Sequence, residues 1–163
     1  MYTYVSLNSP SQSAGNFSTL RNLTLNSGAG AVAVPPGTYG AFNANSGAAF
    51  VFGVTGSTQP AVYNLQGLTL NSSTSLQIVG PVILTLPSSM SLNGPCTAGN
   101  AAHPEWLTIR LASGGLTLNS GVQVHGHVIA PNGTVNVNGI LHGDVVSDGL
   151  TISSNGVLDQ PRP

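Results

Sequence analysis

Apolar and polar residues alternate strictly in short stretches of this chain, and each stretch closes on Asn, Ser or Gly. Alternation with a period of two predicts a strand with one buried face, and the closing residues predict a turn. The same phrase returns along the chain: an apolar residue, Thr or Asn, a second apolar residue, then a polar or glycine turn. Its copies begin at Leu23, Leu68, Met90, Leu116, Val135 and Leu150. Recurrence of one such unit predicts stacked repeats, in which each layer covers the apolar face of its neighbour.

The C-terminal half shows the period of this repeat. One series of strands begins at Leu116, Val135 and Leu150, and a second series begins at Gly121, Gly139 and Gly156. A repeat of about 15–19 residues with three short strands predicts a right-handed parallel β-helix of about eight or nine short triangular rungs. An antiparallel β-sandwich is the alternative, since short strands with Gly turns also fit it, but a sandwich gives no reason for one phrase to recur.

Domain boundaries follow from where the repeat is regular. We expect an N-terminal strand or tail at 1–20, a candidate subunit-linking segment, followed by the solenoid at 21–159 and an extended tail at 160–163. Residues 94–106 form the one insertion long enough to be a lateral loop. Asn at matching turns also predicts a ladder of stacked amides, each side chain bonding the next. The ladder candidates are Asn26, Asn71, Asn93, Asn119 and Asn138.

Charge is nearly absent from the 163 residues. Charged side chains make up 4% of the chain, with no Lys, whereas soluble domains usually carry about 25%. Three scattered arginines cannot build the basic stripe that nucleic-acid binding needs. No apolar run approaches the ~18–20 residues of a spanning helix, and the first residues lack the basic and apolar regions of a signal peptide. A polar surface with a net charge of −1 lacks the repulsion that keeps copies apart, which favours self-association.

The only cysteine, Cys96, rules out a disulfide within the chain and is interpreted as incidental.

A family resemblance rests on four stretches. These are Val-Pro-Pro-Gly-Thr-Tyr at 34–39, Leu-Thr-Ile at 107–109, Val-Ile-Ala-Pro-Asn-Gly at 128–133 and Gly-Ile-Leu-His-Gly-Asp-Val-Val at 139–146. Together they resemble a family of bacterial surface domains, built as β-solenoids, that accompany pilus-type or cell-wall-anchored proteins. More distantly the chain is similar to bactofilins, solenoids that polymerise end to end. The resemblance implies a structural or adhesive role outside the cell or on its surface, and it brings no catalytic residues.

The ends of a stack expose unpaired strands, which natural repeats usually cap. Neither end of this sequence shows a cap, and the first eight residues themselves alternate as a strand. We therefore predict that the terminal strands contact a neighbouring subunit. The candidate contact residues are Met1, Tyr2, Tyr4, Val5, Leu7, Val157, Leu158 and Pro161.

Histidine and aspartate fall into two predicted columns. At the repeat spacing His125, His142 and Asp159 align, and His127 and Asp144 align beside them. Imidazole and carboxylate groups bind Zn²⁺ or Cu²⁺, so His125, His127, His142 and Asp144 are a candidate metal cluster. The simpler interpretation is stacked polar columns at a turn, with His–Asp hydrogen bonds and no metal. We expect no cofactor.

Catalysis is not expected. Hydrolases and lyases on β-helices use clustered carboxylates, often with Lys, Arg or Ca²⁺. The four acids here are dispersed, and only Asp144 and Asp148 are close in sequence, where a solvated turn explains them equally well.

Outward threonines suggest a binding face. Flat ranks of Thr and Asn resemble ice-binding surfaces and could also lie along a sugar polymer, although Thr is simply a good strand residue. The outer-face candidates are Thr24, Thr69, Thr117, Thr151 and, on the lateral loop, Trp106.

The sequence thus predicts a noncatalytic structural protein whose partners are identical subunits, joined end to end in an extracellular or surface filament. The alternative is a surface-presented module that binds glycan or ice.

Overall fold

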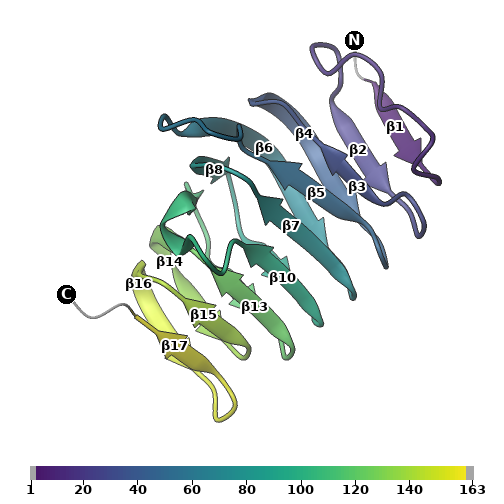
Figure 1. Ribbon diagram of the computed structural model, residues 1–163. Coiled ribbons are helices and arrows are strands. Elements are labelled where there is room, and N and C mark those ends of the chain that lie inside the picture. Colours follow the sequence, from purple (N-terminus) through teal and green to yellow (C-terminus); the bar gives the residue numbers. More distant parts are fainter. Residues whose placement is uncertain (1–2, 161–163) are drawn as a thin grey trace.

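The computed structural model describes residues 3–160 of the chain. Its strands stack in order from the N-terminal to the C-terminal end (Figure 1). Each pairing between strands is parallel. The predicted all-β class with parallel strands is therefore confirmed, and the antiparallel sandwich is excluded. The one helical element in the described part is the 3₁₀ turn η1 (Pro104–Trp106).

The strands form two sheets. The ten-stranded sheet, here sheet A, contains β1 (Tyr4–Leu7), β2 (Asn22–Leu25), β4 (Gly37–Ala44), β6 (Ala61–Leu70), β8 (Val82–Leu86), β9 (Met90–Leu92), β11 (Leu107–Leu111), β12 (Leu116–Leu118), β14 (His127–Val137) and β16 (Val145–Ile152). The seven-stranded sheet, here sheet B, contains β3 (Ala31–Ala33), β5 (Ala49–Phe52), β7 (Thr74–Ile78), β10 (Cys96–Gly99), β13 (Val122–His125), β15 (Ile140–His142) and β17 (Val157–Asp159).

Long strands divide sheet A into two faces. The first half of β6 pairs with β8 and its last residue, Leu70, with Leu92 of β9. In the same way β14 pairs with β11 in its first half and with β12 in its second. Through these two strands, β6, β8, β11, β14, β12 and β9 form a closed circuit of parallel pairing. We call face A1 the set of β1, β2, β9, β12 and the second halves of β4, β6, β14 and β16; face A2 holds β8, β11 and the first halves.

The register reproduces most of the predicted spacing. On face A1, Leu116 pairs with Val135 and Val135 with Leu150, as the spacing of the phrases predicts. On sheet B, Gln123 pairs with Ile140 and Ile140 with Val157, so the two steps are equal in length. The glycine series predicted a longer first step than the pairing shows, because the strand after the first glycine contains an additional residue.

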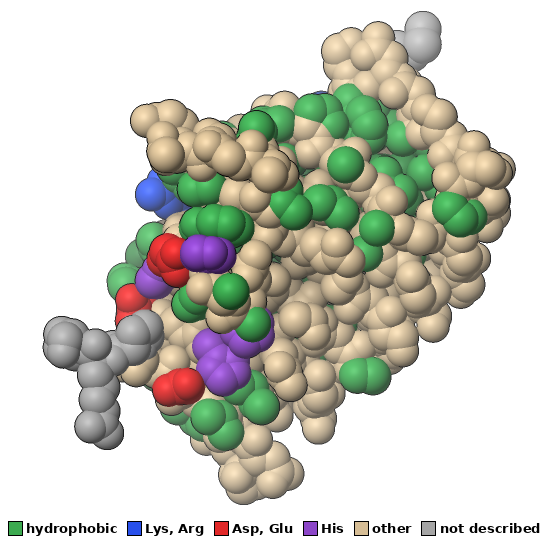
Figure 2. Space-filling model, viewed as in Figure 1, with side chains coloured by type: hydrophobic (Ala, Val, Ile, Leu, Met, Phe, Trp, Pro, Cys, Tyr) green, Lys and Arg blue, Asp and Glu red, His purple; other side chains and the backbone are tan. Residues whose placement is uncertain are grey.

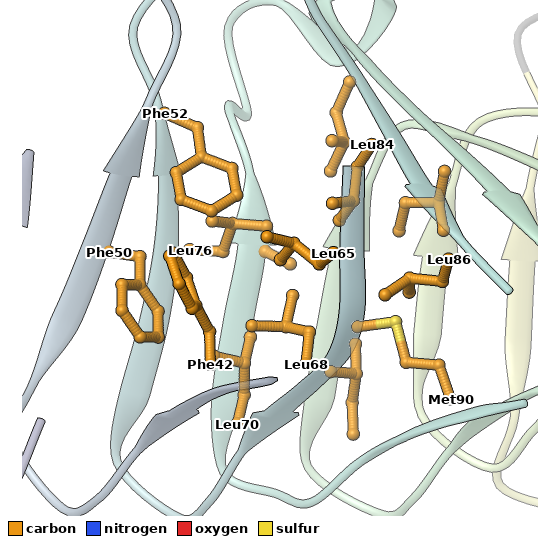
Figure 3. Close-up of a cluster of buried hydrophobic side chains, with 14 of the residues drawn as sticks. Phe42, Phe50, Phe52, Leu65, Leu68, Leu70, Leu76, Leu84, Leu86 and Met90 are labelled. Atoms are coloured by element: carbon orange, nitrogen blue, oxygen red, sulfur yellow. The ribbon is translucent and has the colours of Figure 1, made fainter. Parts of the chain in front are cut away.

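Inward residues of all three strand sets meet in one continuous core (Figure 3). In the N-terminal layers the core is aromatic: Phe42 stacks on Phe50 with ring centroids 5.1 Å apart, and Phe52 stacks on Tyr63 at 4.1 Å. The buried Tyr63 hydroxyl donates to Val34 O at 2.7 Å, so its polar atom is satisfied. In the later layers the core is aliphatic. Each fully buried Leu or Val contributes roughly 1.5–3 kcal/mol by leaving water.

Two predicted boundaries are wrong. The lateral loop was expected at 94–106, but Cys96–Gly99 form β10, paired on both sides with β7 and β13. Cys96 and Ala98 face inward and are buried there, and the small side chains of this strand hide its alternation in the sequence. The N-terminal segment was expected to precede the solenoid, yet β1 pairs in register with β2 and is the first layer of the stack. Of the predicted C-terminal tail, residues 161–163 lie outside the described residues.

Candidate functional site

The C-terminal end of the stack, which we call the tail, leaves core positions uncovered. Leu150 pairs with Val135 and Ile152 with Val137, so both occupy inward positions of face A1. Val135 and Val137 are fully buried, whereas Leu150 and Ile152 are each 45% exposed. The same column position is buried in one layer and open in the next, because no described strand lies beyond β16.

Hydrogen-bonding edges are open at the same place. Among the described residues β16 pairs only with β14, and β17 only with β15. An unpaired parallel edge presents a row of backbone N–H and C=O groups to any strand of matching direction. The tail therefore combines exposed apolar side chains with unpaired backbone.

The N-terminal end, which we call the head, is closed by comparison. Leu7 in β1 is 3% exposed and Leu20 is 2% exposed. The segment between them, residues 8–19, forms no strand and lies beside the next turn of the chain, with Asn8 bonded to Asn26 and Pro10 next to Gly30. Its Phe17 ring meets Tyr39 edge-on at 6.1 Å. This irregular segment completes the first turn of the stack, and the expected absence of a cap at the head stays a prediction.

The predicted contact residues divide between exposed and buried positions. Tyr4 is 75% exposed and Val157 47% exposed, while Val5 and Leu158 are half-buried against the core. Leu7 is buried within the chain, so only its backbone remains open to a neighbouring copy. Met1, Tyr2 and Pro161 lie outside the described residues.

Sequence reasoning missed three exposed apolar residues of the tail. Besides Leu150 and Ile152, Val146 on face A2 is 59% exposed. A signal was available, since Leu150 and Ile152 belong to the recurring phrase, whose apolar side needs a neighbouring layer for burial.

An asparagine ladder is present, but some of the residues that form it differ from those predicted. Its amide Nδ2 groups donate along the stack from Asn26 to Asn8 (2.9 Å), from Asn45 to Asn26 (3.1 Å) and from Asn71 to Asn45 (2.9 Å). A separate bond joins Asn119 to Asn93 at 3.0 Å.

The remaining candidate, Asn138, holds the same backbone position, since its N–H bonds Leu118 O at 2.8 Å. Its side chain makes no ladder bond among the described residues. Asn8 and Asn45 were missed because β1 begins with Tyr and the phrase at 42–45 uses Phe and Ala.

The predicted threonines share one outward column on face A1. By the register Thr24 and Thr69 lie on either side of Asn43, and Thr117 and Thr151 on either side of Asn136. The column is therefore mixed rather than a rank of threonines. Trp106 does not join it, because η1 lies between β10 of sheet B and β11 of face A2.

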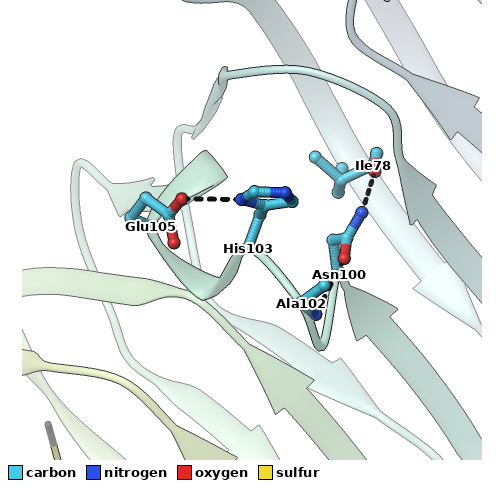
Figure 4. Close-up of polar contacts among 5 residues, drawn as sticks. All are labelled: Ile78, Asn100, Ala102, His103 and Glu105. Atoms are coloured by element: carbon cyan, nitrogen blue, oxygen red, sulfur yellow. Dashed lines mark hydrogen bonds and ion pairs between the residues drawn. The ribbon is translucent and has the colours of Figure 1, made fainter.

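The lateral loop is short and held by its own contacts (Figure 4). Asn100 Nδ2 donates to Ile78 O at 3.1 Å, and its Oδ1 accepts from Ala102 N at 2.9 Å. The His103 ring stacks on half-buried Trp106 with centroids 3.9 Å apart, and His103 Nδ1 lies 3.0 Å from Glu105 Oε1. The backbone N–H of Glu105 and the bond with His103 lower the pKa of that carboxyl.

Histidines and acids gather on one side of the molecule next to the tail (Figure 2). His125 pairs with His142 and His142 with Asp159 in sheet B, and the two imidazole rings stack at 4.7 Å. His142 Nδ1 lies 3.1 Å from Asp159 Oδ2, and His127 Nδ1 lies 3.1 Å from Asp144 Oδ2. The predicted two columns are present as neighbouring pairs.

Glycine separates the two columns. Gly126 ends sheet B and begins face A2, so His125 and His127 lie on different faces. Gly143 occupies the next corner with φ +147, and a Cβ there would overlap Gly126 O. Only glycine allows the layers to approach this closely.

The four candidate ligands therefore do not converge on one point. Among residues 3–160 no group of three or more His, Cys, Asp or Glu is placed to hold a metal ion. A hollow of about 390 Å³ does lie beside the first column, lined by His125, His142, Asp159 and the loop residues Ala101 and Pro104. Burial, and then the neighbouring His142, lower the pKa of His125.

Cys96 is buried, and burial raises the pKa of its thiol to about 11. The thiolate that reacts with oxidants or electrophiles is then scarce at neutral pH.

Comparison with protein-family models, with curated proteins and with solved structures finds no match to this chain. Within the described range no helix is long and apolar enough to cross a membrane.

Proposed function

We propose that this protein is a noncatalytic structural element that self-associates end to end into a filament, outside the cell or on its surface. The observation that carries the proposal is the open tail, where Leu150 and Ile152 are each 45% exposed at positions that are core in the preceding layers. Burying such side chains stabilises an interface by roughly 1.5–3 kcal/mol each at most. The resemblance to bacterial surface domains supports the location.

The proposal takes the fold as a right-handed parallel β-helix of about eight or nine triangular rungs. Three strand sets support this interpretation, since the chain passes face A1, sheet B and face A2 in turn before returning one layer further on. A stack of this kind has only two places where pairing stops, which makes its ends the natural sites of association.

Electron microscopy of negatively stained protein and sedimentation over a range of concentrations test the proposal. We expect end-to-end chains of short rods for the natural protein and single rods for Ile152→Asp, because a carboxylate at the centre of the joint would have to be buried. Thr151→Asp is the matched control, since it adds the same charge on the outward side of the same strand. Single rods of the natural protein at every concentration would overturn the proposal, as would undiminished assembly of Ile152→Asp.

A second candidate is a face that binds glycan or ice, and one observation favours it. Thr24, Thr69, Thr117 and Thr151 do fall in a single outward column of a parallel face. Depletion of the protein from solution by chitin, cellulose or growing ice, reduced in Thr69→Val, would support this function.

A further inference from the structure

We propose that the joint runs head to tail: the free edge of β16 in one copy pairs with the free edge of β1 in the next. The open tail is then covered by the head of a second copy of this chain, and the stacks of the two copies run in the same direction. This inference rests on the proposed function, and it adds which edge of the neighbour covers the tail and in which register.

The alternation of β16 matches that of β1. In β16, Leu150 and Ile152 take inward positions and Thr151 an outward one. The strand β1 repeats this order, since its inward positions pair with the buried Leu23 and Leu25 of β2. A one-residue slip would bring polar residues into the core, which excludes odd shifts, and alignment of the turn residues Asn8 and Ser153 selects one register. The matching register pairs Leu150 with Val5, Thr151 with Ser6 and Ile152 with Leu7.

The asparagine ladder gives the joint a direction. Its three consecutive bonds all run the same way, with each Nδ2 donating to the Oδ1 of the layer nearer the head. Asn8 is the first member, and its own Nδ2 has no acceptor among residues 3–160. At the tail, Ser153 occupies the corresponding turn, since its N–H bonds Val137 O at 3.1 Å. The hydroxyl of Ser153 can accept from the Asn8 amide of the next copy.

The segments that pair in this register are uncharged, with Asp148 of β16 lying just outside them. Neither Tyr4–Leu7 nor residues 149–152 contain a charged side chain. No ion therefore has to be desolvated along the paired edges, which removes the largest cost of burying an interface.

The head also presents partly exposed apolar side chains. Val5, Ala14 and Phe17 are half-buried there against the core. They provide apolar surface that the exposed side chains of the tail can cover.

A joint between two tails fits less well. A two-fold axis across the stack would set β16 antiparallel to its copy, whereas the pairing within the described chain is parallel throughout. Such an axis can also set only one of the three faces against itself, so the other two would meet unlike partners. Head-to-tail stacking keeps the pairing parallel on face A1, where β1 and β16 each have a free edge.

Cysteine cross-linking tests the direction. Ser6→Cys and Thr151→Cys are made in separate chains and mixed under mild oxidation. Paired residues of neighbouring strands would have Cα atoms about 4.8 Å apart, within the range of a disulfide. The natural protein is the control, because its buried Cys96 thiol, with its raised pKa, does not compete.

We expect a disulfide-linked dimer from the mixture and none from either variant alone, and a ladder of multimers from the double variant. Cross-linking of Thr151→Cys alone would show a joint between tails, which overturns the direction but leaves association through the ends standing. Assembly without any cross-link would show another surface and would overturn the end-to-end joint as well. Absence of assembly in sedimentation would overturn both.

A second variant tests the ladder separately. Asn8→Ala removes the donor at the head, and we expect assembly to weaken about tenfold, as loss of one interfacial hydrogen bond implies. A joint between tails does not contain Asn8, so unchanged assembly of this variant would contradict the head-to-tail direction.

Discussion

The two ends of this stack show the same alternation of inward and outward residues, but the inward residues are buried at the head and exposed at the tail. At the head, Leu7 is 3% exposed and the irregular residues 8–19 complete the first turn; at the tail, Leu150 and Ile152 remain 45% exposed. An inward position in a stacked fold is therefore not buried by its own strand. It is buried by the next layer, whether that layer is a strand, an irregular segment or another copy.

The layers near each end differ in the same sense. Those near the head are joined by aromatic stacking, as in Phe42 with Phe50, and by the amide ladder from Asn8 to Asn71. Those near the tail have aliphatic cores and place paired histidines and aspartates at the corners. Contacts within the chain therefore order the layers near the head. Near the tail, apolar side chains and backbone groups of the last described strands stay exposed.

The largest expected effect is a difference in stability loss between a buried and an exposed position in the same column of face A1. Leu118, Val137 and Ile152 align on face A1, with Leu118 fully buried. Leu118→Ala should lower the free energy of unfolding by about 3–5 kcal/mol, through lost burial and a cavity. Ile152→Ala should cost less than about 1 kcal/mol in dilute monomer, since its site is already open. Urea unfolding at low protein concentration measures both, and equal losses would contradict an uncovered tail.

A smaller loss should follow from opening the head. Leu20→Ala removes a side chain that is 2% exposed, and it should cost about 2–3 kcal/mol, at the low end for a buried Leu because an irregular segment can partly collapse. Limited proteolysis is the second readout, with cleavage expected between residues 8 and 19. Leu158→Ala, at a half-buried position of the tail, is the matched control. If both variants melt alike, residues 8–19 do not close the head.

Strand phrases and their spacing could be predicted because alternation and turn residues are local signals. The pairing of successive layers on face A1 follows directly from the positions of Leu116, Val135 and Leu150. The His142–Asp159 pair was also within reach, because one repeat length separates the two residues.

Other features depend on contacts that no local pattern encodes. The strand at 96–99 is built from Cys, Thr, Ala and Gly, whose sizes give weak alternation, and it is defined by its partners on both sides. Asn45 joins the ladder although its phrase lacks Leu, because position in the layer decides membership. Residues 8–19 at the head have no regular structure, so neither the strand period of two nor the helical period could indicate them.

Removal of one asparagine side chain should lower the free energy of unfolding moderately near the head and very little near the tail. Asn45 accepts from Asn71 and donates to Asn26, so Asn45→Ala should lower the free energy of unfolding by about 1–2 kcal/mol. Asn138 makes no side-chain ladder bond among the described residues, and Asn138→Ala should change it by less than about 0.5 kcal/mol. Thermal unfolding of the two variants decides the matter. A larger loss for Asn138 would show that the ladder does not distinguish the layers near the head from those near the tail.

The smallest effect should be a dependence on pH at the tail. Burial, with His142 beside it, lowers the pKa of His125 below 6.5. Between that lowered value and 6.5 the unfolded chain binds more protons at this residue than the folded chain does, so the free energy of unfolding increases with pH there. The contribution is complete above pH 6.5 and is lost as the pH falls through the folded-state value.

Melting temperatures measured from about pH 7.5 to about pH 5 check this dependence. They should fall less steeply for His125→Gln than for the natural protein, and parallel slopes would contradict the prediction. The difference should stay small because the imidazole is largely in contact with water, which screens its interactions. The head, which has no histidine, contributes nothing to this slope.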